Sequence, residues 1–185
     1  MVRARAQRGR NQRNVTVTDA VNDQPPAELL RRLRPIPTYR DHPATVPSDI
    51  SGVAVDGSRR ELRILDSTEP VLLLFLSAGC FGCLDLWEGM AELRGELPVG
   101  LQVVVITKGP EHEDANAVAV LSAGGMSVVM SSSAYEDYRV AGPPFLVLVT
   151  ANSVLTEGVA WGIVETARAV RVALGGRGAW RPDSE

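Results

Sequence analysis

The hydrophobic residues of this chain occur in two kinds of pattern, which predict strands and helices in alternation. Residues 71–76 and 101–107 are largely unbroken apolar runs, too short to cross a bilayer but typical of strands covered on both faces. After Cys80 and over residues 163–174, apolar residues instead recur every three or four positions, which indicates amphipathic helices. We therefore expect buried strands that are covered by helices.

Weaker patterns and turn signals complete the series. Strands are predicted at residues 53–55, 62–64, 71–76, 101–107, 126–130, 145–150 and 154–161. Helices are predicted at residues 80–97, 115–123 and 163–174, with Asp114 capping the second of them and Ser133 capping a further short helix. Asp56-Gly57 separates the first two strands and favours a hairpin ahead of the buried strand. The order predicts an α/β fold with a mixed central sheet and helices on both of its faces.

Composition places one folded domain between two extensions. With 45% hydrophobic and 22% charged residues, the 185-residue chain has the make-up of an ordinary globular protein. Residues 1–40 carry nine arginines against three acidic residues, whereas the remainder of the chain is acidic. We interpret residues 1–47 as a disordered or loosely packed basic extension, 48–176 as the folded domain and 177–185 as a polar tail. The arginines lie in sequence typical of disorder, so no nucleic-acid partner is inferred.

The sequence has no apolar stretch of the length of a membrane span and no signal-peptide core among its first residues. The protein is therefore expected to be cytoplasmic as written, with export or membrane anchoring if the true start lies upstream. Both cysteines belong to one motif, which leaves none for the disulfide framework of a small secreted protein. The oligomeric state is not indicated.

The two cysteines, Cys80 and Cys83, follow the buried strand at the point where the helix pattern begins. Side chains three residues apart on a helix are neighbours, with Cβ atoms about 5–6 Å apart, so a disulfide between them can form and break. The helix N-terminus favours negative charge, so Cys80 is expected to ionise more easily than an ordinary cysteine. Cys83, one turn further along, is placed to attack a mixed disulfide on Cys80. The pair is thus the candidate catalytic site.

Two other roles for the cysteine pair are less favoured. Half of a zinc site would need further ligands, but the chain has no other cysteine and only His42 and His112. A static disulfide across two residues would close a very small loop and constrain the unfolded chain little. Reversible thiol-disulfide exchange therefore fits the pair best, with no metal and no organic cofactor required.

A family resemblance rests on three features together: the element order, the Cys-x-x-Cys motif at the start of the first main helix, and the segment Tyr138-Arg-Val-Ala-Gly-Pro-Pro144 before the late hairpin. With these, about residues 48–176 resemble the thioredoxin superfamily. The leading hairpin and the Ser-Ala-Gly-Cys turn are similar to its TlpA and redoxin branch. The resemblance implies a thioredoxin-like fold in which the peptide bond before Pro144 is cis and Pro144 faces the cysteines.

The resemblance also implies an activity, thiol-disulfide oxidoreductase, and a class of partner. Proteins of this family exchange dithiol and disulfide with protein substrates, among them cytochrome c apoproteins, and use an electron donor or acceptor that this sequence does not identify. A substrate chain is expected to lie extended beside the proline segment while Cys80 attacks its sulfur. Substrate contacts are accordingly assigned to Phe81, Gly82, Pro143 and Pro144.

The sequence departs from the family pattern at several positions. Leu74 stands six residues before the first cysteine, where relatives often have a buried acid or amide that helps the second thiol lose its proton. Another acidic residue would have to take that role. Pro143 lacks the N–H that the family commonly offers to its substrate. Phe81 is expected to lie exposed, whereas Trp87 and Trp161 are assigned to the core.

These departures from the family pattern leave other functions open. The departures also fit a non-catalytic thioredoxin-like binding module or a redox sensor. A redoxin-type peroxidase is less favoured, because those enzymes place Thr or Ser and then Pro ahead of the reactive cysteine and use an arginine that cannot be assigned in this chain. The direction of transfer is open as well, since a reducing thiol pool favours a reductase and export favours an oxidant or a maturation factor.

Overall fold

The computed structural model describes residues 45–175, which form a seven-stranded sheet flanked by helices. Its strands are β1 (Ile50–Val53), β2 (Arg59–Leu62), β3 (Val71–Phe75), β4 (Gln102–Thr107), β5 (Ser127–Met130), β6 (Phe145–Val149) and β7 (Val154–Val159). Across the sheet they follow the order β2-β1-β5-β4-β3-β6-β7. β3, β4 and β5 run parallel, and the other neighbours pair antiparallel, so the predicted mixed sheet is confirmed.

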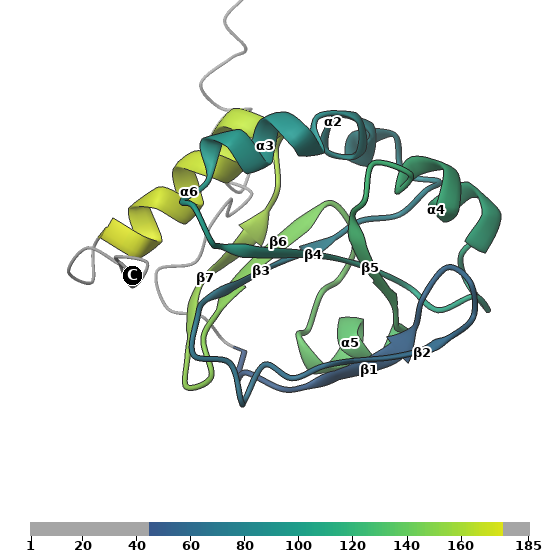
Figure 1. The fold of residues 1–185 in the computed structure, drawn as a ribbon, viewed down its shortest axis with the longest axis horizontal. Helices are drawn as coiled ribbons and strands as arrows, with labels where there is room; N and C mark the ends of the chain where they lie inside the picture. Colours follow the sequence, from purple (N-terminus) through teal and green to yellow (C-terminus); the bar gives the residue numbers. More distant parts are fainter. Residues whose placement is uncertain (1–44, 176–185) are drawn as a thin grey trace, which may run out of the picture. The chain divides into compact units, whose positions relative to one another are not determined.

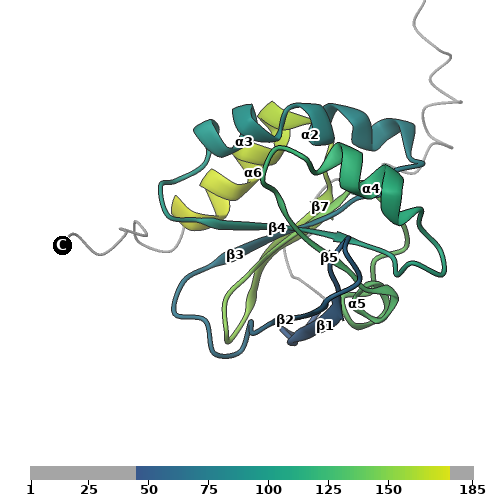
Figure 2. The same ribbon diagram turned by 45° about the vertical axis from the view of Figure 1, so that its right-hand side comes forward.

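Helices cover both faces of this sheet, as predicted (Figure 1). They are η1 (Phe81–Cys83), α2 (Leu84–Glu88), α3 (Met90–Glu96), α4 (Ala115–Leu121), α5 (Ser132–Asp137) and α6 (Ile163–Gly175). Figure 2 shows from a second direction that α2, α3, α4 and α6 lie together on one face, while α5 lies on the other. The sheet is therefore the middle layer of three.

The central strand β3 takes part in both layers of the core, because all five of its residues are buried. Leu72 and Leu74 belong to the core under α2, α3, α4 and α6. Leu73 and Phe75 belong to the core on the α5 side, where the Phe75 ring packs edge-on against Tyr135 with 5.0 Å between ring centres. Alternate residues face opposite layers, which is why the strand is hydrophobic without interruption.

Two elements differ from their sequence prediction. β1 and β2 pair antiparallel, but each begins three residues earlier than its hydrophobic pattern indicates. The single helix predicted over residues 80–97 is interrupted at Gly89, which separates α2 from α3. A Cβ on Gly89 would lie 2.7 Å from Ile163 Cδ1 and 2.8 Å from the Asp85 carbonyl oxygen, so glycine permits the close approach of α6.

Capping side chains fix the starts of two helices. Asp114 caps α4 as predicted, since its carboxylate accepts hydrogen bonds from the N–H groups of Asn116 and Ala117. Ser131, not Ser133, caps α5, because its hydroxyl accepts from a backbone N–H of the first turn at 3.3 Å. The predicted capping signal for α5 is therefore wrong by two residues.

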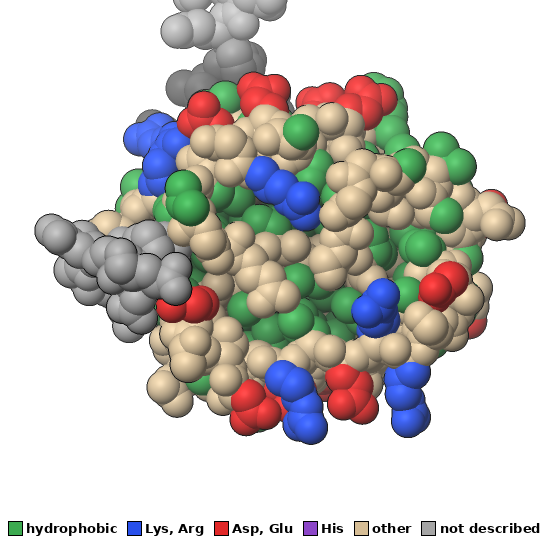
Figure 3. All heavy atoms as spheres, viewed as in Figure 1, with side chains coloured by type: hydrophobic (Ala, Val, Ile, Leu, Met, Phe, Trp, Pro, Cys, Tyr) green, Lys and Arg blue, Asp and Glu red, His purple; other side chains and the backbone are tan. Residues whose placement is uncertain are grey.

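The outer strand β2 presents charged side chains to solvent. Arg63, just after it, lies 3.6 Å from an Asp49 oxygen and 3.8 Å from a Glu61 oxygen. Figure 3 shows acidic and basic side chains alternating along the lower edge, where Figure 1 places β1 and β2. Charges along an edge strand oppose its pairing with another sheet.

The ends of the chain lie outside the described residues. Nearly all of the predicted extension, residues 1–47, and the whole predicted tail, residues 177–185, fall there, so these domain boundaries stay predictions. Within residues 45–175, none of the helices has the length and apolar character needed to cross a membrane.

Gly52 on β1 is packed too closely to accept a side chain. A Cβ there would overlap the Met130 carbonyl oxygen on β5 and lie 2.9 Å from Val129 Cγ1. We expect Gly52→Ala to lower the free energy of unfolding by about 1–3 kcal/mol, as over-packing does in other proteins. Urea unfolding followed by circular dichroism measures the change. Gly124→Ala is the matched control, since nothing lies within 4 Å of its Cβ, and equal losses in both variants would contradict the prediction.

Candidate active site

The turn after β3 positions the first cysteine. Residues 77 and 78, which follow the strand, form hydrogen bonds with two other segments. Trp87 Nε1 on α2 donates to the Ser77 carbonyl at 3.2 Å, and the Ala78 N–H donates to Glu113 Oε2 at 3.2 Å. Trp87 is only 2% exposed, which confirms its assignment to the core. These contacts hold Cys80 at the start of η1.

Cys80 and Cys83 are both free thiols, but they differ in exposure. Cys80 is partly exposed, whereas Cys83 is fully buried in the core under the helices. Burial, followed by a hydrogen bond with Cys80, raises the pKa of the Cys83 thiol to about 12. An incoming reactant therefore meets the sulfur of Cys80 first.

A proline loop faces the thiols across the site. The peptide bond between Pro143 and Pro144 is cis, which confirms the expectation drawn from the family resemblance. The Cys80 thiol donates a long hydrogen bond of 3.8 Å to the Pro143 carbonyl. Gly82 lies against the same loop, since a Cβ on it would be 3.6 Å from Pro144 Cδ. The fold thus brings four of the residues assigned from sequence to one place.

Two aromatic side chains lie exposed around this loop. Phe81, between the cysteines, is 90% exposed, as expected. Trp161 is 54% exposed, so its assignment to the core is wrong. β7 ends at Val159, and the next N–H, from Ala160, donates to the Pro144 carbonyl at 3.2 Å. Trp161 therefore lies beyond the strand and close to the proline loop.

The acidic residue near the thiols is Glu113, which the sequence analysis did not single out. Leu74, at the position where the family pattern has a buried acid, is fully buried in the apolar core. Glu113, in the loop between β4 and α4, instead accepts the hydrogen bond from Ala78, and its charge contributes to the raised pKa of Cys83. The sequence offered one indication of Glu113, namely that it follows β4, the parallel neighbour of β3. Loops that follow neighbouring parallel strands meet at one edge of a sheet, so Glu113 could be expected near the turn after β3.

No protein-family model matches the chain, and no curated protein matches it significantly. The thioredoxin domain of a thiol-disulfide oxidoreductase from Bacteroides vulgatus aligns with a TM-score of 0.56 and 18% identity, over 69% of this chain and 94% of that one. The domain has the thioredoxin fold.

Two further solved structures align with this chain to a similar extent. A secreted Mycobacterium tuberculosis disulfide oxidoreductase homologous to E. coli DsbE aligns with a TM-score of 0.54 and 13% identity, over 68% of this chain and 95% of that one. StoA from Bacillus subtilis aligns with a TM-score of 0.52 and 12% identity, over 70% of this chain and 98% of that one. At these identities the alignments show the fold alone.

The difference in burial predicts a difference in alkylation of the reduced protein. At pH 7, iodoacetamide is expected to label Cys80 and to leave Cys83 unmodified, because a pKa of about 12 keeps Cys83 a neutral, buried thiol. Labelling of Cys83 should rise only as the pH approaches that value or when urea unfolds the protein. Peptide mass spectrometry over a pH series measures both sites, and equal labelling at pH 7 would contradict the prediction.

Proposed function

We propose that this protein is a thiol-disulfide oxidoreductase that acts on protein substrates through Cys80 and Cys83. The observation that carries the proposal is the approach of the Cys80 sulfur to the cis-proline loop, 3.8 Å from the Pro143 carbonyl. A partly exposed thiol beside a partly exposed loop suits attack on a disulfide in an extended chain. The thiol-disulfide oxidoreductases among the structural neighbours support the same reaction class.

Reduction of a substrate would proceed in two balanced steps. The Cys80 thiolate attacks one sulfur of the substrate disulfide; the bond between Cys80 and the substrate forms as the substrate disulfide breaks, and the leaving thiolate takes up a proton. Cys83 then loses its proton and attacks Cys80, which forms the Cys80–Cys83 disulfide and releases the second substrate thiol. Two electrons pass to the substrate, and a donor dithiol restores the pair. Oxidation of a substrate is the same sequence in reverse.

Docking would use the surface around the proline loop. Pro143 has no N–H to donate, but its carbonyl oxygen lies on the side of the thiol, where a substrate N–H can bond to it. Gly82 lies against Pro144 of the same loop, and the exposed Phe81 precedes it in sequence. The exposed Trp161 adds a large apolar surface nearby. We therefore expect partners whose reactive disulfide lies in an accessible, extended segment.

A redox sensor or binding module is the second candidate. The observation that favours it is the high pKa of Cys83, about 12, because a resolving thiol that rarely ionises at neutral pH would leave mixed disulfides long-lived. Both candidates share the first covalent step at Cys80. They differ in turnover.

Turnover of insulin disulfides separates the two candidates. With dithiothreitol as electron donor, we expect the wild-type protein to accelerate insulin reduction and Cys80→Ser to run at the background rate, since this variant lacks the accessible nucleophile. Pre-reduced Cys83→Ser, freed of dithiothreitol and mixed with insulin, should instead accumulate a mixed disulfide, visible on a non-reducing gel, because the resolving thiol is gone and no other dithiol can replace it. Equal rates for wild type and Cys80→Ser would favour the binding module.

A further inference from the structure

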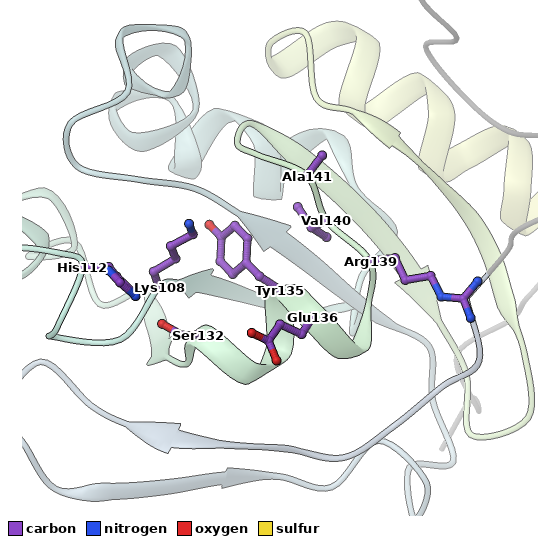
Figure 4. A pocket seen from close by; sticks show the side chains of 8 residues that line it. All are labelled: Lys108, His112, Ser132, Tyr135, Glu136, Arg139, Val140 and Ala141. Carbon is purple, nitrogen blue, oxygen red and sulfur yellow. The ribbon is translucent and has the colours of Figure 1, made fainter.

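A cavity of about 300 Å3, which neither cysteine lines, is not used by the exchange steps. Three segments form its walls: the loop after β4, the helix α5, and the residues that lead to the proline loop. Its lining, drawn in Figure 4, consists of Lys108, His112, Ser132, Tyr135, Glu136, Arg139, Val140 and Ala141. The walls are thus partly apolar and partly charged.

Lys108 gives the cavity its particular chemistry. It is the only lysine in a chain that has eighteen arginines. Its Nζ lies 5.7 Å from the centre of the Tyr135 ring, and Figure 4 shows both side chains in the lining. None of the carboxylates in the described part of the chain forms an ion pair with Lys108. The ammonium group of this exposed residue therefore lies over an aromatic wall with its charge available to a ligand.

The other basic side chains of the cavity are arranged unequally. His112 lies on the same side of Tyr135 as Lys108 in Figure 4, and its ring nitrogens can donate a hydrogen bond. Arg139 lines the cavity, but its guanidinium points away from Tyr135. Donor groups are thus concentrated at the wall formed by Lys108 and His112.

Three acidic residues lie in or near these walls, and the charge of His112 acts on one of them, Glu111. Glu111 accepts a hydrogen bond from the Ser132 hydroxyl, which lowers the pKa of the Glu111 carboxyl. Glu113 is bonded to the Ala78 N–H, on the side of the thiols. Glu136 belongs to the lining and, like Lys108 and His112, is exposed to solvent, where salt and water screen all three charges.

Two short paths join the cavity to the thiols. The Tyr135 hydroxyl donates to the Leu76 carbonyl at 3.0 Å, directly before the turn that leads to Cys80. Ala141 of the lining lies two residues before Pro143, whose carbonyl faces the Cys80 sulfur. An extended chain advances about 3.3–3.6 Å per residue, so two or three residues of a docked substrate span the same stretch of loop.

We propose that this cavity binds the carboxylate of an Asp or Glu that stands two or three residues from the reacting cysteine of the protein substrate. The inference rests on the proposed function, because the exchange reaction places the substrate at Cys80. Lys108 supplies the charge, His112 a second donor and Tyr135 the apolar wall. A lysine ammonium is a compact point charge that suits a single carboxylate in a small space. In a domain rich in acidic residues, this wall is a local site of attraction for an acidic side chain.

Two peptide disulfides test the proposal with the full-length protein. They are identical except for Glu or Gln two residues from the reacting cysteine, and exchange is followed at low ionic strength, where exposed charges are least screened. We expect kcat/KM of the wild type to be about 2- to 5-fold higher for the Glu peptide, mainly through KM, as one exposed ion pair allows. Lys108→Gln should abolish this preference, and Lys108→Arg should keep part of it. Arg94→Gln, which removes a charge on α3 outside the cavity, should keep all of it.

Each alternative result has a defined meaning. Normal exchange of both peptides without a preference would overturn the subsite and leave the proposed function standing. If Arg94→Gln and Lys108→Gln lost the preference equally, the preference would be an effect of the protein's net charge and the subsite would be overturned. Glutathione disulfide is tested as a third substrate. If Lys108→Gln slowed exchange with glutathione disulfide but with neither peptide, the cavity would bind the carboxylate of a small thiol compound, and the proposal would also be overturned.

Binding without chemistry separates the two hypotheses if exchange is absent altogether. A Glu peptide with Ser in place of its cysteine cannot react, so its binding reports on the cavity alone. We expect it to shift the NMR signals of Lys108 and Tyr135 in wild-type protein, and the matching Gln peptide to shift them less. Unchanged signals with both peptides would overturn the subsite, whereas selective shifts in a protein that exchanges no disulfide would refute only the proposed function.

Discussion

The pairing of β3 with β6 sets the geometry on which the site depends. The two strands are antiparallel, with Phe75 opposite Phe145. The end of β3 and the start of β6 therefore meet at the same edge of the sheet, so Cys80 comes to lie beside the proline pair that precedes Phe145. Residues 63 positions apart in sequence are brought together in this way. A slip of one residue would turn the buried side chains of a strand to the opposite face, so the two cores hold this register in place.

The unequal roles proposed for the two thiols follow from the helix that carries them. The helical segment after the turn must bury one face against the sheet, and Cys83 lies on that face with Leu86, Trp87 and Met90. Cys80 precedes the first helical turn and stays at the edge of the sheet, where it is partly exposed. The order in which the sulfurs meet a substrate is thus set by packing. It needs no charged residue between the cysteines.

Sequence patterns locate the sheet, the main helices and the cysteine motif because each depends on local spacing or on burial of a whole segment. They fail where two distant segments meet. Gly89 interrupts a clear helical pattern because α6 passes close to it, and Trp161 continues a strand pattern although the strand has already ended. Glu113 and Lys108 have no distinctive local signal either, since their relation to the thiols exists only once the loop after β4 is folded against β3 and α5.

Leu74 and Glu113 together explain how an acidic group can act on the thiols without entering the core. An ionised carboxylate at the fully buried position of Leu74 would lose its hydration, which costs several kcal/mol unless it is paired. Glu113 comes from a loop, is only partly buried and is hydrogen-bonded to a backbone N–H. After burial itself, its charge is among the causes that raise the pKa of both Cys83 and Tyr135. Lys108 lies in the same loop, with its Nζ 5.7 Å from the centre of the Tyr135 ring, so one loop carries charged groups near the thiols and at the cavity. Changes within it would alter the proposed reactivity and the proposed substrate choice together.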